Sequence, residues 1–357
     1  MKDIDDQSVF EELDQDNIRG SILALAKQCQ QAWDETQQLT IPANYRDVDN
    51  VVVCGMGGSA LGTDVVKALY HHTLRVPVES IRGYHVPAYV GHKTLVLISS
   101  YSGTTEEALS CLAEAKERKA KVLGIASGGL LAELLKQENL PGYIFEPRYN
   151  PSDQPRMGLG YSVIGQFGLL AKVGLLDPAT VRLPAIISII EQKNQLFRYD
   201  VPTRVNPAKM LAVQLAGKMP FVFAAEHLSG NAHVFANQIN ENAKTFGGYF
   251  LLSEINHHLL EGLSFPDQLP QDIVCICLES KLYEAHMQKR FVITKELLQK
   301  RGVSVLAFSP GAQDRILQSF ETLVFGSWVS FYLAMVSGVN PAPIPNVDYF
   351  KEQMKKE

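Results

Sequence analysis

The chain lacks an excess of basic residues and any block of them. It has 357 residues, with 33 Lys and Arg against 38 Asp and Glu, and its formal net charge is −5. A surface that binds nucleic acid or an anionic membrane concentrates positive charge. We therefore expect neither a nucleic-acid partner nor a membrane partner.

Long apolar stretches are also missing. The first twenty residues are acidic and contain no apolar core of a signal peptide, and no apolar run approaches the roughly 20 residues of a membrane span. Only five cysteines occur, and Cys275 and Cys277 share one strand without the histidine or second cysteine pair of a zinc site. We predict a cytoplasmic protein with reduced core cysteines and no metal site.

What the chain does contain is enough apolar sequence for two domains, at 46% hydrophobic residues. Short apolar segments alternate with helical patterns in both halves, which predicts two doubly wound parallel sheets in tandem, each a three-layer αβα arrangement. The expected strands are 50–54, 76–82, 94–99, 121–126, 221–225, 249–252, 273–278 and 303–308. The expected units are an N-terminal helical extension (1–45), a first α/β domain (46–180), a helical linker (181–204), a second domain (205–340) and a tail returning to the active site (341–357).

The segment around residue 100 organises the first domain. A buried strand over Thr94–Ser99 leads into a hydroxyl-rich turn, and a helix begins after Thr105. Backbone N–H groups and a helix N-terminus favour a phosphate there, and Ser100, Ser102 and Thr105 add O–H donors. The turn has no lysine, so it suits a sugar monophosphate better than a Mg-nucleotide. The alternative is an ordinary strand-to-helix cap.

A glycine-rich turn follows the preceding strand, with the sequence Gly55-Met56-Gly57-Gly58-Ser59. Three glycines allow the backbone to approach a ligand closely. A dinucleotide site is less well supported, because the third glycine of that fingerprint is missing. In addition, no acid about 20 residues further on clearly fits the position that binds a ribose, and Glu79 is the nearest candidate. Both turns lie where strands end, which is the ligand-binding edge of a parallel sheet.

Three further residues carry candidate catalytic chemistry. Glu241 lies in the last turn of an expected helix between two asparagines that can orient it, and the helix dipole there makes a carboxylate a stronger base. His257 follows sixteen residues later, and Arg156 lies in a proline-braced loop. A carboxylate and a histidine near a phosphate can move a proton beside a carbonyl. Taken singly, each residue also fits a solvated surface position.

The motifs in order resemble those of the bifunctional phosphoglucose/phosphomannose isomerases, which have two sugar isomerase (SIS) domains. The resemblance covers about residues 45–355, and the Asn-Glu-Asn-Ala-Lys segment at 240–244 is its most specific part. By this resemblance Glu241 is the base, His257 opens the sugar ring with Lys351, and Arg156 stabilises the enediolate. The phosphate-binding residues it implies are Gly58, Ser59, Ser100, Ser102 and Thr105.

The resemblance implies an aldose–ketose isomerase that interconverts glucose 6-phosphate, and mannose 6-phosphate, with fructose 6-phosphate through an enediol. It implies that the reaction uses no metal and no redox cofactor. It also implies a homodimer whose active site is shared between subunits. Two departures bear on substrate choice: Thr104 stands where many members have Asn, and Ala232–Phe235 replaces an arginine-rich stretch. A non-catalytic sugar-phosphate sensor and an isomerase of another or amino-sugar phosphate remain alternatives.

Overall fold

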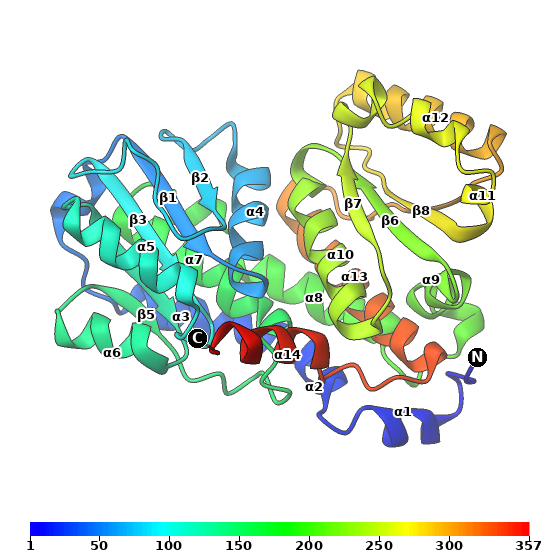
Figure 1. Ribbon diagram of the computed structural model, residues 1–357, viewed down its shortest axis with the longest axis horizontal. Helices are drawn as coiled ribbons and strands as arrows, with labels where there is room; N and C mark the ends of the chain where they lie inside the picture. Colours follow the sequence, from blue (N-terminus) through cyan, green and yellow to red (C-terminus); the bar gives the residue numbers. More distant parts are fainter. Residues whose placement is uncertain (357) are drawn as a thin grey trace.

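The computed structural model describes residues 1–356, which form an α/β protein with two parallel sheets (Figure 1). The first sheet has the strand order β2-β1-β3-β4-β5. The predicted parallel strands of this half are all confirmed, and β5 was not predicted. Their bounds are β1 (Asn50–Gly55), β2 (Val78–Ile81), β3 (Thr94–Ser99), β4 (Lys121–Ala126) and β5 (Gly142–Ile144).

Both faces of the first sheet are covered by helices, because its strands are apolar on both sides. All six residues of β3 are buried. Val96 and Ile98 point to a cluster with α5 (Glu106–Glu117) and α6 (Gly129–Gln137). Leu95 and Leu97 belong to the main core, with α4 (Gly58–Tyr70) and α7 (Leu159–Val173). Continuous apolar strands of this kind are typical of parallel sheets.

The second sheet has the order β7-β6-β8-β9, and all four strands are parallel. Its strands are β6 (Met219–Ala224), β7 (Gly248–Leu251), β8 (Ile273–Leu278) and β9 (Ser304–Phe308). The helices of this half are α9 (Pro207–Leu215), α10 (Ser229–Ala243), α11 (Leu269–Asp272), α12 (Ala285–Lys300) and α13 (Arg315–Ser337). The strands and long helices predicted here agree with the structure to within a few residues.

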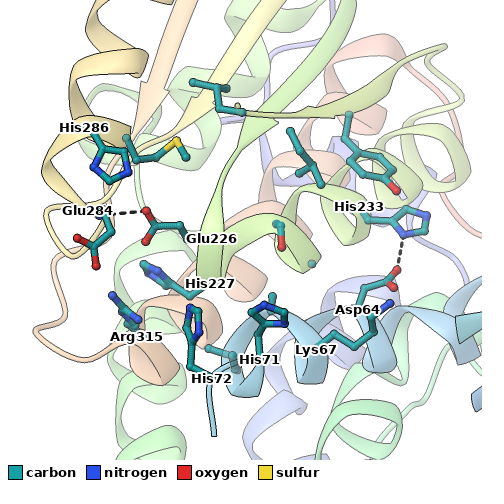
Figure 2. A pocket seen from close by; sticks show the side chains of 18 residues that line it. Asp64, Lys67, His71, His72, Glu226, His227, His233, Glu284, His286 and Arg315 are labelled. Carbon is teal, nitrogen blue, oxygen red and sulfur yellow. Dashed lines mark hydrogen bonds and ion pairs between the residues drawn. The ribbon is translucent and has the colours of Figure 1, made fainter. Parts of the chain in front are cut away.

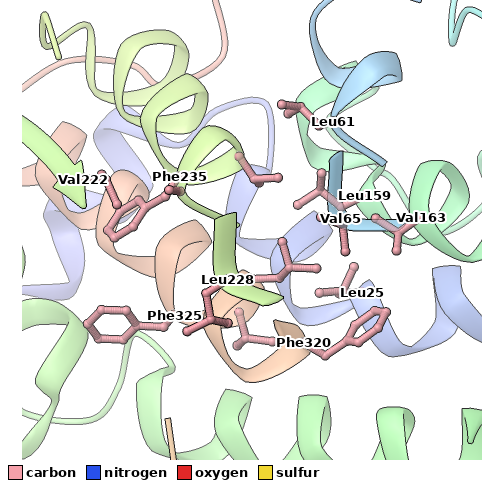
Figure 3. Packing of buried hydrophobic residues seen from close by; sticks show 14 of the residues in the cluster. Leu25, Leu61, Val65, Leu159, Val163, Val222, Leu228, Phe235, Phe320 and Phe325 are labelled. Atoms are coloured by element: carbon pink, nitrogen blue, oxygen red, sulfur yellow. The ribbon is translucent and has the colours of Figure 1, made fainter. Parts of the chain in front are cut away.

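Helix α13 is the long apolar element that the sequence analysis did not single out. By length and composition its 23 residues could cross a membrane, but its most apolar window is entirely buried within the protein. Phe320 and Phe325 of this helix pack among residues from both halves of the chain (Figure 3). It is therefore the central helix of the core, and its apolar character follows from that burial.

The N-terminal segment, predicted as a helical extension, forms three α-helices. They are α1 (Gln7–Leu13), α2 (Ile18–Leu23) and α3 (Leu25–Gln37). Helix α3 packs tightly on α7, since a Cβ at Gly168 would lie 2.0 Å from the Thr36 hydroxyl. Phe10 of α1 stacks on Phe331 of α13, with ring centroids 5.9 Å apart. These helices thus pack against both halves of the molecule.

Two other helices connect or follow the sheets. The linker contains α8 (Leu183–Phe197), and Asn194 accepts a hydrogen bond from the Trp328 indole at 2.9 Å. The C-terminal residues form α14 (Pro345–Met354), which has no buried residue. Figure 1 shows α14 crossing below the boundary between the two halves.

Helices α4 and α10 pack against each other between the sheets and run in opposite directions. Near the start of α10, a Cβ at Gly230 would lie 2.5 Å from the backbone of Asp64, in the middle of α4. At the other end, the backbone of Arg156 touches Gly58 at the start of α4, while its side chain reaches Asn242 at the end of α10. Each end of this helix pair therefore meets the carboxyl edge of a different sheet.

Candidate active site

The turn after β3 presents the start of α5 to solvent. Ser100 is buried, and its hydroxyl lies 2.8 Å from that of Thr105 and accepts the Gly103 N–H at 3.1 Å. Thr105 is the N-cap residue of α5, yet its side chain makes no capping hydrogen bond. The first N–H groups of this helix are therefore free of a side-chain acceptor, which is the condition for anion binding at a helix N-terminus.

Glycine is required at the centre of this turn. Gly103 has φ +70°, and a Cβ there would lie 1.8 Å from the Gly128 carbonyl oxygen. The exposed Ser102 follows Tyr101, and its hydroxyl is 3.0 Å from that of Thr104. The turn is thus fixed from behind by the loop after β4, while Ser102 faces solvent and is available to a ligand.

The glycine-rich turn after β1 packs against the first turn and the arginine loop. Gly57 has φ +50°, and α4 begins after it without a side-chain cap. The Ser59 hydroxyl accepts the Tyr101 N–H at 2.8 Å. A Cβ at Gly58 would lie 3.0 Å from the Arg156 backbone nitrogen. The structure therefore brings the two predicted phosphate turns and the Arg156 loop together at one edge of the sheet.

Arg156 is buried and its guanidinium is fully hydrogen-bonded. Its Nε donates to Asn242 Oδ1 at 2.6 Å, and Nη1 donates to Gln154 Oε1 at 2.8 Å and to Glu241 Oε2 at 3.3 Å. The Arg156 side chain is 0% exposed and that of Glu241 28%. Burial lowers the pKa of Arg156, and the Glu241 carboxylate opposes that shift. A buried cation and a half-buried carboxylate thus face each other at this site.

The chain after α13 supplies the remaining partners of Arg156. The carbonyl oxygens of Pro341 and Ala342 accept hydrogen bonds from Nη2 at 2.7 and 2.8 Å. Lys244 also donates to the Pro341 carbonyl at 2.9 Å. Partial burial of its ammonium group and the nearby Arg156 charge lower the pKa of Lys244 to about 8. The sequence did not predict that these two backbone carbonyls, or the Gln154 side chain, would accept hydrogen bonds from Arg156.

The asparagines beside Glu241 do not orient it as predicted. Asn242 holds Arg156 instead and donates to Ser330 Oγ at 3.1 Å. Asn240 donates to the backbone carbonyls of Ala236 and Gly247. The group that orients the Glu241 carboxylate is Arg156 itself. Side chains on either side of Glu241 point away from it because successive helical residues are rotated by about 100°.

His257 and Lys351 lie outside this group. His257 is exposed in a short 3-10 helix (Glu254–His257) beyond β7, and Lys351 is exposed on α14. Over residues 1–356, neither forms a hydrogen bond or ion pair with Glu241 or Arg156. Within one chain, the structure assembles the phosphate turns, Arg156 and Glu241, and it leaves the other two predicted residues at the surface.

A cavity of about 680 Å³ lies elsewhere, between the end of α4 and the start of α10 (Figure 2). Several histidines line it, and His233 Nδ1 and Asp64 Oδ2 form a hydrogen bond at its edge, 2.6 Å apart. Sequence reasoning missed this cavity. In residues 1–356 no group of three or more His, Cys, Asp or Glu side chains is placed to hold a metal ion.

Comparison with known sequences gives related proteins over nearly the whole chain. Residues 204–354 match the family described as the bacterial phospho-glucose isomerase C-terminal SIS domain. A bifunctional phosphoglucose/phosphomannose isomerase from Caldicellulosiruptor bescii is 31% identical over 94% of this chain and 98% of its own length. A D-glucosamine-6-phosphate 4-epimerase from Sulfolobus acidocaldarius is 30% identical over 71% of this chain and 77% of its own.

Solved structures with low sequence identity share the fold. A hypothetical protein from Thermus thermophilus superposes with a TM-score of 0.72 at 18% identity, over 98% of this chain and 92% of that one. The C-terminal domain of glucosamine-fructose-6-phosphate aminotransferase from Francisella tularensis gives 0.70 at 11% identity, over 96% and 99% of the two chains. At these identities the likeness establishes the architecture alone.

Proposed function

This chain belongs to the bifunctional phosphoglucose/phosphomannose isomerase family, and we propose that it interconverts fructose 6-phosphate with glucose 6-phosphate and mannose 6-phosphate. The observation that carries the proposal is the pairing of Glu241 with the buried Arg156 beside two uncapped helix N-termini. A base, a fixed cation and an anion site at one sheet edge are what an aldose–ketose isomerisation requires. The two parallel sheets then correspond to tandem SIS domains.

The phosphate of the substrate binds at the starts of α4 and α5. The uncapped N–H groups of α5 and the exposed hydroxyl of Ser102 supply donors there. Ser100 and Thr105 bond to each other at 2.8 Å and hold the shape of the turn, and Ser59 does the same for Tyr101. Fixing the phosphate positions the sugar carbons beside Glu241, so binding energy is used for orientation.

Glu241 moves the proton between C1 and C2. It takes the proton from C1 of fructose 6-phosphate and returns it to C2, and the negative charge of the enediolate develops on O1 and O2. The Arg156 Nη1–H that contacts Glu241 at 3.3 Å is the longest of the five hydrogen bonds of that guanidinium. We infer that this N–H turns to the enediolate oxygens, a contact made mainly along the reaction path.

Ring opening uses His257 of a second subunit together with Lys351. The support is that His257 is exposed and, within residues 1–356, forms no hydrogen bond or ion pair with its own Glu241 or Arg156, so an active site completed within one chain lacks it. We propose a homodimer in which each subunit contributes this histidine to its neighbour. Lys351 reaches the site from α14, which has no buried residue of its own within the chain. The proposed location is the cytoplasm.

Turnover of fructose 6-phosphate in deuterated water tests the function. We expect formation of glucose 6-phosphate and mannose 6-phosphate, with deuterium at C2 from exchange of the enediol proton on Glu241. Binding of fructose 6-phosphate without product and without exchange, at high protein concentration, would favour the sensor alternative.

The similarity to a D-glucosamine-6-phosphate 4-epimerase supports a second candidate, action on an amino-sugar phosphate. The same assay with glucosamine 6-phosphate distinguishes the two. A kcat/KM for glucosamine 6-phosphate at least tenfold above that for fructose 6-phosphate would replace the isomerase proposal.

A further inference from the structure

The 680 Å³ cavity occupies the same place in the second sheet that the proposed active site occupies in the first. In the two strand orders, β6 stands where β1 stands and β8 where β3 stands. The cavity is lined by Glu226, His227 and Ser229 after β6 and by Glu284 in the segment after β8. It therefore lies at the carboxyl edge of the second sheet, which is the ligand-binding edge of such sheets.

Helices α4 and α10 are antiparallel, so at each site the start of one helix lies beside the end of the other. The end of α10 carries Glu241 and Lys244 to the first site, and the end of α4 carries His71 and His72 to the cavity. Arg156 precedes α7 at the first site, and Arg315 begins α13 at the cavity. The two halves thus place cationic side chains at both sheet edges.

One buried side chain in the cavity lacks a partner. His227 is 2% exposed, its Nε2 lies 2.9 Å from Gln318 Oε1, and its Nδ1 has no hydrogen bond. Gln318 donates through its Nε2 to the Ala312 carbonyl, and its Oε1 accepts from Ser280, so the Nε2 of His227 is the donor. The free Nδ1 is then an acceptor. Burial lowers the pKa of His227 to about 4, which keeps the ring neutral at pH 7.

The charged residues of the cavity are divided between two walls. Figure 2 shows Lys67, His71 and His72 on α4 along one side with Arg315, and Glu226 and Glu284 toward the other. The Glu226 carboxylate accepts the Glu284 N–H at 3.0 Å, at the start of α12. A carboxylate thus occupies the helix N-terminus that the first sheet leaves open, so an anion has its cationic partners on the α4 side.

Asp64, the other acid on the α4 side, is already neutralised. Arg82 contacts it at 2.5 Å and His233 at 2.6 Å. These contacts leave Lys67 and Arg315 as the available permanent charges on that wall. Figure 2 shows them at its opposite ends, with His71 and His72 between them, and Arg315 is the one nearer to Glu226 and His227. The opposite wall carries acceptors, namely the Glu226 and Glu284 carboxylates and the His227 Nδ1, which suit the O–H groups of a ligand; His286 and Ser229 also line the cavity.

We propose that this cavity is a second ligand site, which takes a small phosphorylated polyol with its phosphate at Arg315 and its hydroxyl groups at Glu226 and His227. The proposed isomerisation uses none of these residues. The volume of about 680 Å³ falls in the usual range for small-molecule sites. The free acceptor of His227 is a buried polar group without a protein partner, and a ligand hydroxyl would satisfy it.

Equilibrium dialysis with radiolabelled fructose 6-phosphate tests the site in the full-length Glu241→Gln protein, which binds substrate without turnover. We expect two bound molecules per chain. In the same background, Arg315→Gln should weaken one site at least tenfold, as expected for loss of a charged contact to phosphate. Lys300→Gln, an exposed lysine at the end of α12, is the matched control and should leave two sites.

One bound molecule per chain in the Glu241→Gln protein would overturn the proposal. So would two sites that both survive the Arg315 substitution in protein with an unchanged Tm. His227→Phe, which keeps an aromatic ring but removes the acceptor, should weaken the second site alone. Isomerase activity is measured separately on the unsubstituted protein, so an inactive protein with two binding sites would refute the proposed function and leave this site standing.

Discussion

Replacing Glu241 by glutamine separates chemistry from folding at the proposed active site. The substitution keeps the size of the side chain and an oxygen that can accept from Arg156. It removes the negative charge and the basic oxygen. The Glu241 carboxylate is 28% exposed, whereas the Arg156 side chain is 0% exposed. Loss of the Glu241 charge should therefore affect stability less than loss of the Arg156 charge would, and an effect on activity can be separated from an effect on folding.

The expected change in stability is small. The lost contact is the longest of the Arg156 hydrogen bonds, at 3.3 Å, and one of its partners is partly solvated. Asn242, Gln154 and two backbone carbonyls still hold the guanidinium. We therefore expect a decrease of about 1 kcal/mol in the free energy of unfolding, near the value for an exposed pair and well below the cost of stranding a buried charge.

The expected loss of activity is much larger. A general base typically contributes about 10² to 10⁴ in rate, which is about 3–5 kcal/mol of transition-state stabilisation. We expect kcat to fall by at least the upper figure, because no second carboxylate contacts Arg156 over residues 1–356. Steady-state kinetics and deuterium exchange at C2 measure the effect, with thermal unfolding as the folding control. Glu296→Gln, at an exposed glutamate on α12, is the matched control and should retain activity.

Retention of kcat within tenfold in Glu241→Gln, at an unchanged Tm, would refute the assignment of the base. A loss of both activity and several kcal/mol of stability would instead show that the Arg156–Glu241 pair is mainly structural.

Three further outcomes are expected. Ser102→Ala should raise KM about tenfold with little change in kcat, and glucose 6-phosphate should raise Tm more than glucose does; equal protection by the two sugars would contradict the phosphate site. His257→Ala should lose less activity on substrate analogues with a larger open-chain fraction, and mixing it with Glu241→Gln should restore activity through hybrid dimers; an inactive mixture whose hybrid dimers are demonstrated would count against a shared site. Burial raises the pKa of Asp14 to about 6, so its ionisation destabilises the fold as pH rises from about 4 to above 6; the Tm of Asp14→Asn relative to the unsubstituted protein should increase over that interval, and a constant difference would show that the shift is absent.

The amino-acid pattern was sufficient to predict the sheets and most of their helices. Strands β3 and β8 have the bounds predicted for them, because each is a continuous apolar run buried on both faces. Helix α5 begins after Thr105, a residue type that favours the N-cap position, and α7 ends before Gly174, which adopts the left-handed conformation. Local signals of this kind need no knowledge of distant residues.

Elements without a local signal depend on packing against the rest of the molecule. Strand β5 has three residues, Gly142–Ile144, and is held by pairing with β4 at the edge of the first sheet. Helix α14 has no buried residue, and its sequence was assigned only to a tail. The conformation of β5 therefore depends on its pairing with β4, whereas α14 lies exposed on the surface.

The same distinction applies to the sites. The hydroxyl turn and the segment around Glu241 were recognisable as motifs, since their residue types lie close together in the sequence. The Arg156 hydrogen bonds to Pro341 and Ala342 join positions about 185 residues apart. The cavity at His227 likewise needs the end of α4, the start of α10 and the start of α13. Neither contact set has a sequence pattern, because only packing of the two halves brings these residues together.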